Sequence, residues 1–166
     1  MKVNQWLPGL NEMNKLVISI VVFFLIPFVS HAGDDPPNKP IVNVTLLQSS
    51  TSWDGGSFNY PEGKPQITVS TITVPEGVSL AMHCHPVPLA GMVVKGTLEV
   101  TTANGESRIF EEGEAVIEVF NTWHYGKGLS GDTELFVVYM GAEGMPVTVL
   151  MDGDPEQAKL CRTTAD

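Results

Sequence analysis

The stretch GVSLAMHCHPVPLAGMVVKG, Gly77–Gly96, decides the fold. Its apolar residues are interrupted by glycine and proline, which is typical of short strands that reverse direction often. His83 and His85 stand one residue apart at the end of the first apolar run. Because successive side chains of a strand point to opposite faces, both imidazoles project to one side and Cys84 to the other. Two imidazoles on one face are well placed to chelate a divalent cation.

A third ligand is expected from His124, the only other histidine after residue 32. It lies in FNTWHYG, directly after another predicted strand, and antiparallel pairing would bring it opposite His83 and His85. We therefore predict that these three histidines hold one divalent metal ion. Imidazole ligands do not distinguish Fe, Zn, Mn, Ni or Cu. A metal-free barrel, in which the histidines only form hydrogen bonds, is the alternative.

The rest of the chain after residue 40 shows an all-β pattern. Short runs of Val, Ile, Thr and Leu alternate with Gly, Pro and Asn, as in sandwiches and barrels. Asn104-Gly105 predicts a hairpin with a type I′ turn. The predicted strands are Ile41–Gln48, Gln66–Val74, Ser79–His83, Gly91–Val94, Thr97–Thr102, Ser107–Phe110, Ala115–Val119, Glu134–Met140 and Val147–Met151.

The N-terminal region has the pattern of a secretory signal. Lys15 precedes an apolar run, Leu16–Val29, and Ser30-His31-Ala32 then supplies a small-x-small cleavage site. The run is shorter than the roughly 20 residues of a bilayer-spanning helix. We predict that residues 1–32 form a cleaved signal helix, with Met13 as the true start. The mature protein is then exported, periplasmic or secreted, without a stable membrane anchor; an uncleaved anchor is the alternative.

One domain is expected after the signal, since the whole chain has 166 residues. Residues 33–40, GDDPPNKP, predict a flexible lead, residues 41–152 a single β-barrel, and residues 153–166 a C-terminal tail. Within the tail we predict a short helix at Pro155–Leu160, with Asp154 as its N-cap.

The net charge limits the kinds of binding partner, and the two cysteines bear on the cellular compartment. Nine basic residues against 19 acidic ones give a net charge of −10, which disfavours nucleic acid and anionic membranes as partners. An exported protein can form disulfides. Cys84 and Cys161 either pair or remain two thiols, because pairing depends on a distance that the sequence does not contain.

Two segments resemble the motifs of the cupin superfamily. Gly77–Gly96 resembles the first motif, G-x5-H-x-H-x3–4-E-x6-G, with both glycines and both histidines in register. Gly113–Gly128, GEAVIEVFNTWHYGKG, resembles the second motif, G-x5-P-x-G-x2-H-x3-N, with Gly113 and His124 in register. The resemblance implies a double-stranded β-helix, which is a jelly-roll or RmlC-like barrel, with a metal ion inside its mouth. It also implies a homodimer, since members of the family often pair through strand edges.

The chain departs from both motifs. Leu89, or Ala90 with the longer spacing, stands where the family places a metal-binding glutamate. In the second motif Val119, Asn121 and Gly128 replace the proline, glycine and asparagine. The resemblance therefore implies a three-histidine variant of the site, similar to that of some thiol and diketone dioxygenases. Three neutral imidazoles leave the full double charge on the ion, which favours a chelating anionic ligand.

Glu118 is the nearest acidic residue to the second motif and a candidate fourth ligand. The apolar residues Ala115, Ile117 and Val119 alternate with it, so the strand pattern predicts that Glu118 points outward.

Four further residues are candidates for the surroundings of the site. Tyr139 and Arg108 could orient a substrate, or serve as a tyrosine at the edge of the core and a solvated arginine. Trp123 and Tyr125 flank His124 and are expected to pack around it. The sequence identifies no catalytic residue.

The predicted function is that of a metal-binding cupin acting on a small molecule. Its most concrete form is a dioxygenase-like oxidoreductase that uses O2 at a three-histidine iron site. The rival prediction is a non-enzymatic module that captures a small ligand or a metal ion in the extracytoplasmic space.

Overall fold

The computed structural model of the protein describes residues 39–161. The predicted signal segment, most of the lead and residues 162–166 lie outside the described residues. The barrel unit begins at Val42. Among the described residues, no helix is both long enough and apolar enough to cross a membrane.

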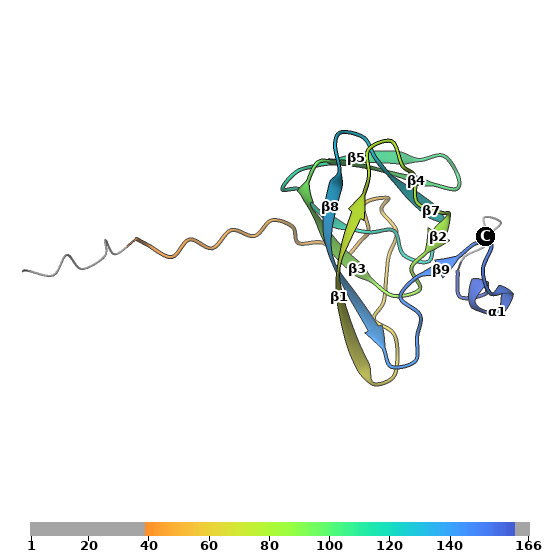
Figure 1. Ribbon diagram of the computed structural model, residues 1–166. Helices are drawn as coiled ribbons and strands as arrows, with labels where there is room; N and C mark the ends of the chain where they lie inside the picture. The colour runs from red at the N-terminus through yellow and green to blue at the C-terminus, as the bar shows by residue number, and fades with distance from the viewer. Residues whose placement is uncertain (1–38, 162–166) are drawn as a thin grey trace, which may run out of the picture. The chain divides into compact units, whose positions relative to one another are not determined.

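Two antiparallel sheets form the barrel (Figure 1). The first sheet contains, in spatial order, β1 (Pro65–Val74), β8 (Thr133–Ala142), β3 (Leu89–Lys95) and β6 (Ala115–Ile117). The second sheet contains β5 (Ser107–Glu111), β4 (Thr97–Thr102), β7 (His124–Gly128), β2 (His83–Cys84) and β9 (Val149–Leu150). Most neighbouring strands are distant in the sequence because the chain passes repeatedly between the sheets. This arrangement is a double-stranded β-helix, which confirms the predicted all-β fold class.

The hydrophobic core lies between the sheets and follows the two-residue alternation of the strands. In β4 the side chains of Leu98 and Val100 are buried, while their neighbours are partly exposed. Leu135 and Val137 of β8 are buried in the same way. The buried cluster consists of Val87, Leu89, Val93, Leu98, Val100, Phe110, Val116, Leu135, Val137 and Tyr139.

Two glycine turns close the strands. Gly105 connects β4 to β5 with a φ of 89°, as expected for a hairpin, but Asn104 is not in the left-handed region. The predicted type I′ turn, which needs positive φ at both residues, is therefore wrong. Gly96 joins β3 to β4 with a φ of 79°, and a β-carbon there would lie 3.0 Å from the backbone oxygen of Asp132. This close approach explains the last glycine of the first motif.

The predicted strand at Ile41–Gln48 is wrong, because these residues form no strand. Val44 and Leu46 are 67% and 63% exposed. Alternating apolar residues favour an extended chain, but a strand also needs a neighbour that accepts and donates its hydrogen bonds. No such neighbour lies beside this segment among residues 39–161.

The other predicted strands are present, several with shifted ends. The predicted strand Ser79–His83 is reduced to an isolated bridge at Ser79 followed by the two residues of β2. The predicted strands Ala115–Val119 and Val147–Met151 shorten to β6 and β9.

The sequence pattern does not predict β7, because its glycines weaken strand propensity. Gly128 is required by packing, since a β-carbon there would lie 2.9 Å from the carbonyl oxygens of Val74 and Pro75. Gly128 therefore lowers the strand propensity of β7 in the sequence, and the same residue allows β7 to lie against the end of β1.

The tail is attached to the barrel. Helix α1 (Pro155–Ala158) is shorter than predicted, and Asp154 caps it by accepting a hydrogen bond of 2.9 Å from the backbone N–H of Glu156. Cys84 and Cys161 form a disulfide. Of the two alternatives that the sequence left open, a bridge or two thiols, the structure shows the bridge. Cys84 packs outside the barrel in a small buried cluster with Trp123, Val149 and Cys161.

Candidate metal centre

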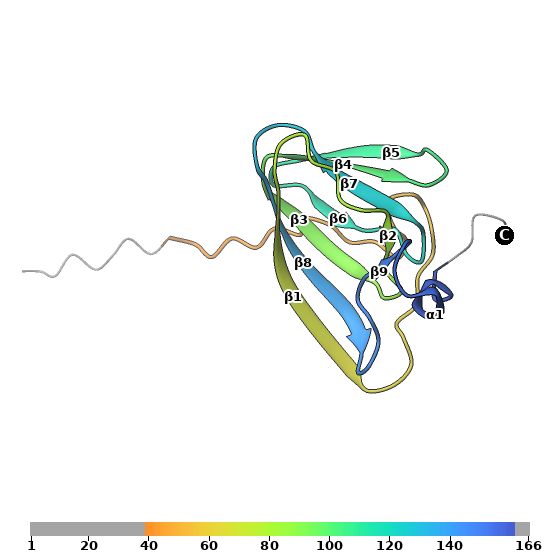
Figure 2. The ribbon, with the colours of Figure 1, turned by 45° about the vertical axis from the view of Figure 1, so that its right-hand side comes forward.

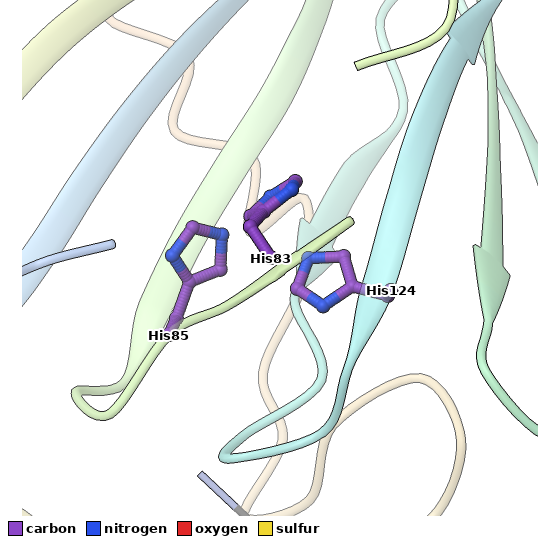
Figure 3. Close-up of side chains that lie close together, drawn as sticks. All are labelled: His83, His85 and His124. Atoms are coloured by element: carbon purple, nitrogen blue, oxygen red, sulfur yellow. The ribbon is translucent and has the colours of Figure 1, made fainter. Parts of the chain in front are cut away.

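Three histidines converge inside the barrel. His83 of β2 and His124 of β7 are direct partners in the antiparallel ladder, and His85 follows β2 by one residue. Figure 3 shows the three rings gathered together. The ring centroids are 4.4 to 5.1 Å apart, and one ligand atom from each ring lies within 4.8 Å of the others. All three side chains are buried.

In each of the three rings, one nitrogen is hydrogen-bonded to the backbone and the other is left for the cavity. His83 Nδ1 lies 2.7 Å from the carbonyl oxygen of Ala81, His85 Nδ1 lies 2.9 Å from that of Val147, and His124 Nδ1 lies 2.8 Å from that of Thr122. A carbonyl only accepts hydrogen bonds, so each ring donates from Nδ1 and keeps a free lone pair on Nε2. Backbone carbonyls fix metal-binding histidines in this tautomer. The donor set therefore fits one divalent cation.

Burial favours neutral rings, which are the form that binds metal. The pKa of His85 lies well below its usual 6.5, first because burial removes water and then because His124 and His83 are close. The pKa of His83 is lowered by the same burial and by His124. Both rings are therefore ready to bind a cation without first losing a proton at neutral pH.

A cavity of about 250 Å³ adjoins the histidines. Its lining is mainly aliphatic, with contributions from both sheets. The polar side chains that line it are His83, His85, Glu118, His124, Tyr139 and Thr148. A mostly apolar pocket with a few convergent polar groups is typical of a small-molecule site.

Glu118 faces this cavity, so the prediction that it points outward is wrong. Its side chain is 8% exposed, and Oε1 accepts hydrogen bonds of 2.9 Å from the Trp53 indole N–H and from the backbone N–H of Val119. The inward residues of this segment are Val116 and Glu118, whereas the sequence pattern suggested the alternate set. Shifting the phase of a strand by one residue exchanges its two faces.

Glu118 also lies beside the position that lacks the family's glutamate. Its backbone N–H donates a hydrogen bond of 3.1 Å to the carbonyl oxygen of Leu89. Leu89 fills the core with an aliphatic side chain, and the neighbouring chain segment brings a carboxylate into the same cavity. Glu118 thus brings a carboxylate close to the position where the first motif lacks one. This carboxylate is hydrogen-bonded to Trp53 and not to the histidine cluster.

Tyr139 lines the cavity, as a substrate-orienting residue would. Its ring lies 5.5 Å from that of His85, centroid to centroid. Burial raises the pKa of its hydroxyl, and Glu118 raises it further, while a hydrogen bond with Thr148 acts in the opposite direction. The hydroxyl is therefore protonated and able to donate a hydrogen bond.

Three candidates lie elsewhere. Arg108 forms an ion pair of 2.7 Å with Glu114 and covers the Phe110 ring, away from the histidines. Trp123 packs in the disulfide cluster, and Tyr125 does not line the cavity. Strand alternation explains this outcome, since His124 points inward and both of its neighbours point away.

Asn121 explains one departure from the second motif. It stands at the motif's glycine position and has a φ of 55°, a conformation that asparagine adopts more readily than most residues. Its backbone N–H donates a hydrogen bond of 3.0 Å to the carbonyl oxygen of His85. The turn before His124 is thereby fastened to the segment that carries the other two histidines.

Two residues of the site are not predicted by the sequence pattern. Trp53 reaches Glu118 from a loop 65 residues away in the sequence, and Thr148 approaches His85 Nδ1 to 3.3 Å from the segment before β9. Neither residue has a local pattern that distinguishes it from an ordinary core tryptophan or a strand threonine.

The barrel and the histidine cluster define a jelly-roll protein with a candidate metal centre. Residues 70–139 match the family model of the cupin domain, a range that contains both motif segments and all three histidines. This match confirms the resemblance to the cupin superfamily that the two motifs indicate.

The chain is similar to several solved structures, at low identity. A chain from crystal structures of DMSP lyases is 19% identical with a TM-score of 0.46, and the match covers 52% of this chain and 44% of that one. A cupin-like protein from Thermotoga maritima is 15% identical with a TM-score of 0.45, covering 56% and 71%. The oxalate decarboxylase of Lactobacillus farciminis is 15% identical with a TM-score of 0.46, covering 51% and 26%. The match thus spans less than half of either enzyme chain.

These likenesses assign no activity to this chain, because one fold can carry many functions. No curated protein sequence matches it. Its activity must be argued from the cavity and the residues that line it.

Proposed function

We propose that the protein is a metal-dependent oxidoreductase that acts on a small molecule inside the barrel. The observation that carries this proposal is the convergence of three buried imidazoles, each with Nε2 free, on a largely apolar cavity. His83, His85 and His124 would hold one divalent ion, which we propose to be iron. A bound iron supplies a Lewis acid for the substrate and redox chemistry with O2.

The number of ligands favours catalysis over a purely structural site. Structural metal sites are closed by four protein ligands, whereas catalytic sites keep positions open for water or substrate. Among the described residues, only the three histidines form a cluster that could hold a metal ion.

The charges in the cavity indicate the class of substrate. Three neutral imidazoles leave a bound dication uncompensated, which favours an anionic ligand. The carboxylate of Glu118 would repel a substrate that arrives already charged. A neutral molecule with an acidic proton, such as an enol, a thiol or a phenol, satisfies both groups if it gives that proton to Glu118 as it binds.

Glu118 is the residue we propose as the general base. Oε1 receives both hydrogen bonds, from Trp53 and Val119, so Oε2 is left for the substrate's proton. A base with one oxygen fixed and one directed to the substrate is held in position before the substrate binds. The Tyr139 hydroxyl would then orient an oxygen of the same substrate by donating a hydrogen bond.

We propose that the protein works outside the cytoplasm. The signal-like pattern of residues 13–32 supports this location, as does the disulfide between Cys84 and Cys161. Disulfides persist in oxidising compartments and are rare in the cytosol.

Two measurements test the proposed function. Elemental analysis of the purified protein should find about one transition metal ion per chain in the wild type and a loss of most of it in His85→Ala. Tyr125→Phe, which changes a residue outside the cavity, is the matched control and should keep the metal. Substoichiometric metal in the wild type and His85→Ala alike would overturn the metal site.

Oxygen uptake with thiols, diketones and phenols then tests the activity. Turnover that depends on the bound metal supports the oxidoreductase. Stoichiometric metal without turnover of any of these substrates would instead favour a non-enzymatic binding module in the same compartment.

A further inference from the structure

The polar side chains of the cavity lie in one layer of the barrel. Tyr139 of β8 pairs with Leu89 of β3, and the backbone N–H of Glu118 donates a hydrogen bond to the carbonyl oxygen of the same leucine. The Tyr139 ring is 5.5 Å from that of His85, so the histidine cluster lies at the height of these residues. Thr148 belongs to the same layer, because its hydroxyl is 3.3 Å from His85 Nδ1. We call this the polar layer; it contains the polar side chains that line the cavity.

The next layer has a glycine in each sheet. Strand alternation places Gly91 two residues beyond Leu89 on β3 and Gly126 two residues beyond His124 on β7. Figure 2 shows β3 in one sheet and β7 in the other, and both glycines line the cavity. The residues that pair with them and also line the cavity are all valines, namely Val100, Val116 and Val137. We call the space between these five residues the glycine chamber.

The glycine chamber lies between the polar layer and a closed end of the barrel. Strands β8 and β7 lead from the polar layer to Thr133 and Gly128. A β-carbon on Gly128 would lie 3.3 Å from Thr133 Oγ1, so both strands lead to the same end of the barrel. The layer beyond the chamber contains Leu98 and Leu135, which are buried. Val74 pairs with Thr133 at the end of the sheet, and both residues are completely buried.

The backbone does not require glycine at either position of the chamber. Neither Gly91 nor Gly126 has a positive φ. Glycine inside a strand weakens the strand and often marks a place that a ligand or another backbone approaches closely. A β-carbon on Gly126 would meet side-chain carbons of Leu98 and Leu80 first, at 3.3 and 3.5 Å, and not the backbone. The absence of a side chain at Gly126 therefore keeps space free inside the cavity.

The size and the lining of this space limit what it can hold. The whole cavity measures about 250 Å³. An apolar cavity of about 150 Å³ is enough to bind benzene. The cavity therefore has room for one ring and the group attached to it, but not for two rings. The side chains around the glycine chamber are aliphatic, so a polar group placed there would lose its hydrogen bonds to water without replacement.

We propose that the glycine chamber holds the ring of a single-ring phenol, whose hydroxyl reaches the polar layer. A simple thiol would leave the chamber empty, and the enol of a diketone carries a second oxygen that also needs a polar partner. A phenol places one acidic oxygen directly on a compact hydrocarbon ring. The role of its hydroxyl rests on the proposed function, whereas the binding of the ring rests on the chamber alone.

Calorimetric titration of the full-length, Zn²⁺-loaded protein with para-cresol and with naphthol tests the proposal. The wild type should bind para-cresol, and naphthol at least about 10-fold more weakly. Gly126→Val places three carbons in the chamber and should weaken para-cresol binding by at least about 10-fold. Gly141→Ala is the matched control, because Gly141 does not line the cavity, and its affinity should not change. A wild type that does not bind para-cresol, or equal affinity in the wild type and Gly126→Val, would overturn the proposal.

A variant that enlarges the chamber tests the same claim by a gain of binding. Leu98→Ala removes the side chain nearest to the free space at Gly126 and should improve naphthol binding by about 10-fold. Such a gain cannot come from a protein that fails to fold. An unchanged preference for para-cresol in Leu98→Ala would contradict the assignment of the ring to this chamber.

Titration of the metal-free protein separates this inference from the proposed function. If para-cresol binds with chelator present and Gly126→Val weakens that binding, the ring site stands even where no metal-dependent oxygen uptake is found. If the protein holds one metal ion and oxidises only thiols, without binding para-cresol, the proposed function stands and the ring site is wrong.

Discussion

In each histidine of the cluster, the tautomer is set by which ring nitrogen is hydrogen-bonded to the backbone. Three separate carbonyls, those of Ala81, Val147 and Thr122, accept from the three Nδ1 atoms. For His83 and for His124 the carbonyl belongs to the residue two positions earlier in the chain. These two bonds are therefore local consequences of the turn into each strand. The bond of His85 comes from a distant segment. A metal ion thus finds three lone pairs oriented before it arrives, which is the usual role of outer partners in metal sites.

Glu118→Gln should separate binding from catalysis. Glutamine keeps an oxygen that accepts from Trp53 and Val119, so the cavity and the metal content should not change. It cannot take a proton, and loss of a general base typically lowers turnover by about 10²–10⁴-fold. Metal content and metal-dependent oxygen uptake are measured together. Glu134→Gln, an exposed carboxylate on β8, is the control; equal turnover in the two variants would remove Glu118 from the mechanism.

Acid should destabilise the metal-free protein through His83 and His85. Burial lowers the pKa of both rings below the usual 6.5, so in the window below about pH 6.5 the unfolded chain binds more protons than the folded one. The free energy of unfolding should therefore fall as the pH falls through this window. Urea unfolding with chelator present, at about pH 7.5 and about pH 5.5, measures the difference. His85→Gln should shrink that difference; an unchanged difference would contradict the assignment.

At the scale of the elements, the sequence predicted the type of fold and the histidine cluster but not the phase of β6. The H-x-H spacing and the apolar alternation are local, and both follow from the geometry of a strand. The orientation of Glu118 depends on which face of β6 meets the core, and Val116 occupies that face. Alternation shows that a strand has two faces, and only packing against Leu89 and Trp53 decides which one is buried.

The missed strand β7 and the mistaken strand at Ile41–Gln48 have a common cause. Strand propensity describes single residues, whereas a strand exists only when a neighbour pairs with it. Gly126 and Gly128 have low propensity and yet pair with β4, while residues 42–48, which include two valines and a threonine of high propensity, have no strand partner among residues 39–161.

Gly128→Ala tests the packing reason for the glycine in β7. A β-carbon at this position would meet two carbonyl oxygens at 2.9 Å, and backbone atoms cannot move aside cheaply. Overpacking of this kind typically costs about 1–3 kcal/mol of unfolding free energy. Gly141→Ala is the matched control, because its β-carbon would make only ordinary contacts at 3.5 Å or more. Urea unfolding compares the two; an equal effect would show that lost flexibility, and not crowding, governs both sites.

At the scale of the whole molecule, the disulfide joins the end of the described chain to the strand that carries the site. Cys84 lies between His83 and His85, and β2 has only two residues of its own. Strand pairing alone holds β2 weakly, so the bond from Cys84 to Cys161 restrains both histidines from the outer side of the barrel. The site therefore depends on a covalent link that lies outside the cavity.

Removing this link should weaken both the fold and the site. The disulfide joins residues 77 positions apart, and loss of such a bridge typically lowers the free energy of unfolding by about 2–4 kcal/mol. The double variant Cys84→Ala, Cys161→Ala should show this loss in urea and should also bind Zn²⁺ more weakly in a chelator competition. Reductant should reproduce both effects in the wild type and change nothing in the double variant, which lacks the bond. If reduction of the wild type lowered stability but left Zn²⁺ affinity unchanged, β2 would hold its histidines by packing alone, and the proposed restraint would be wrong.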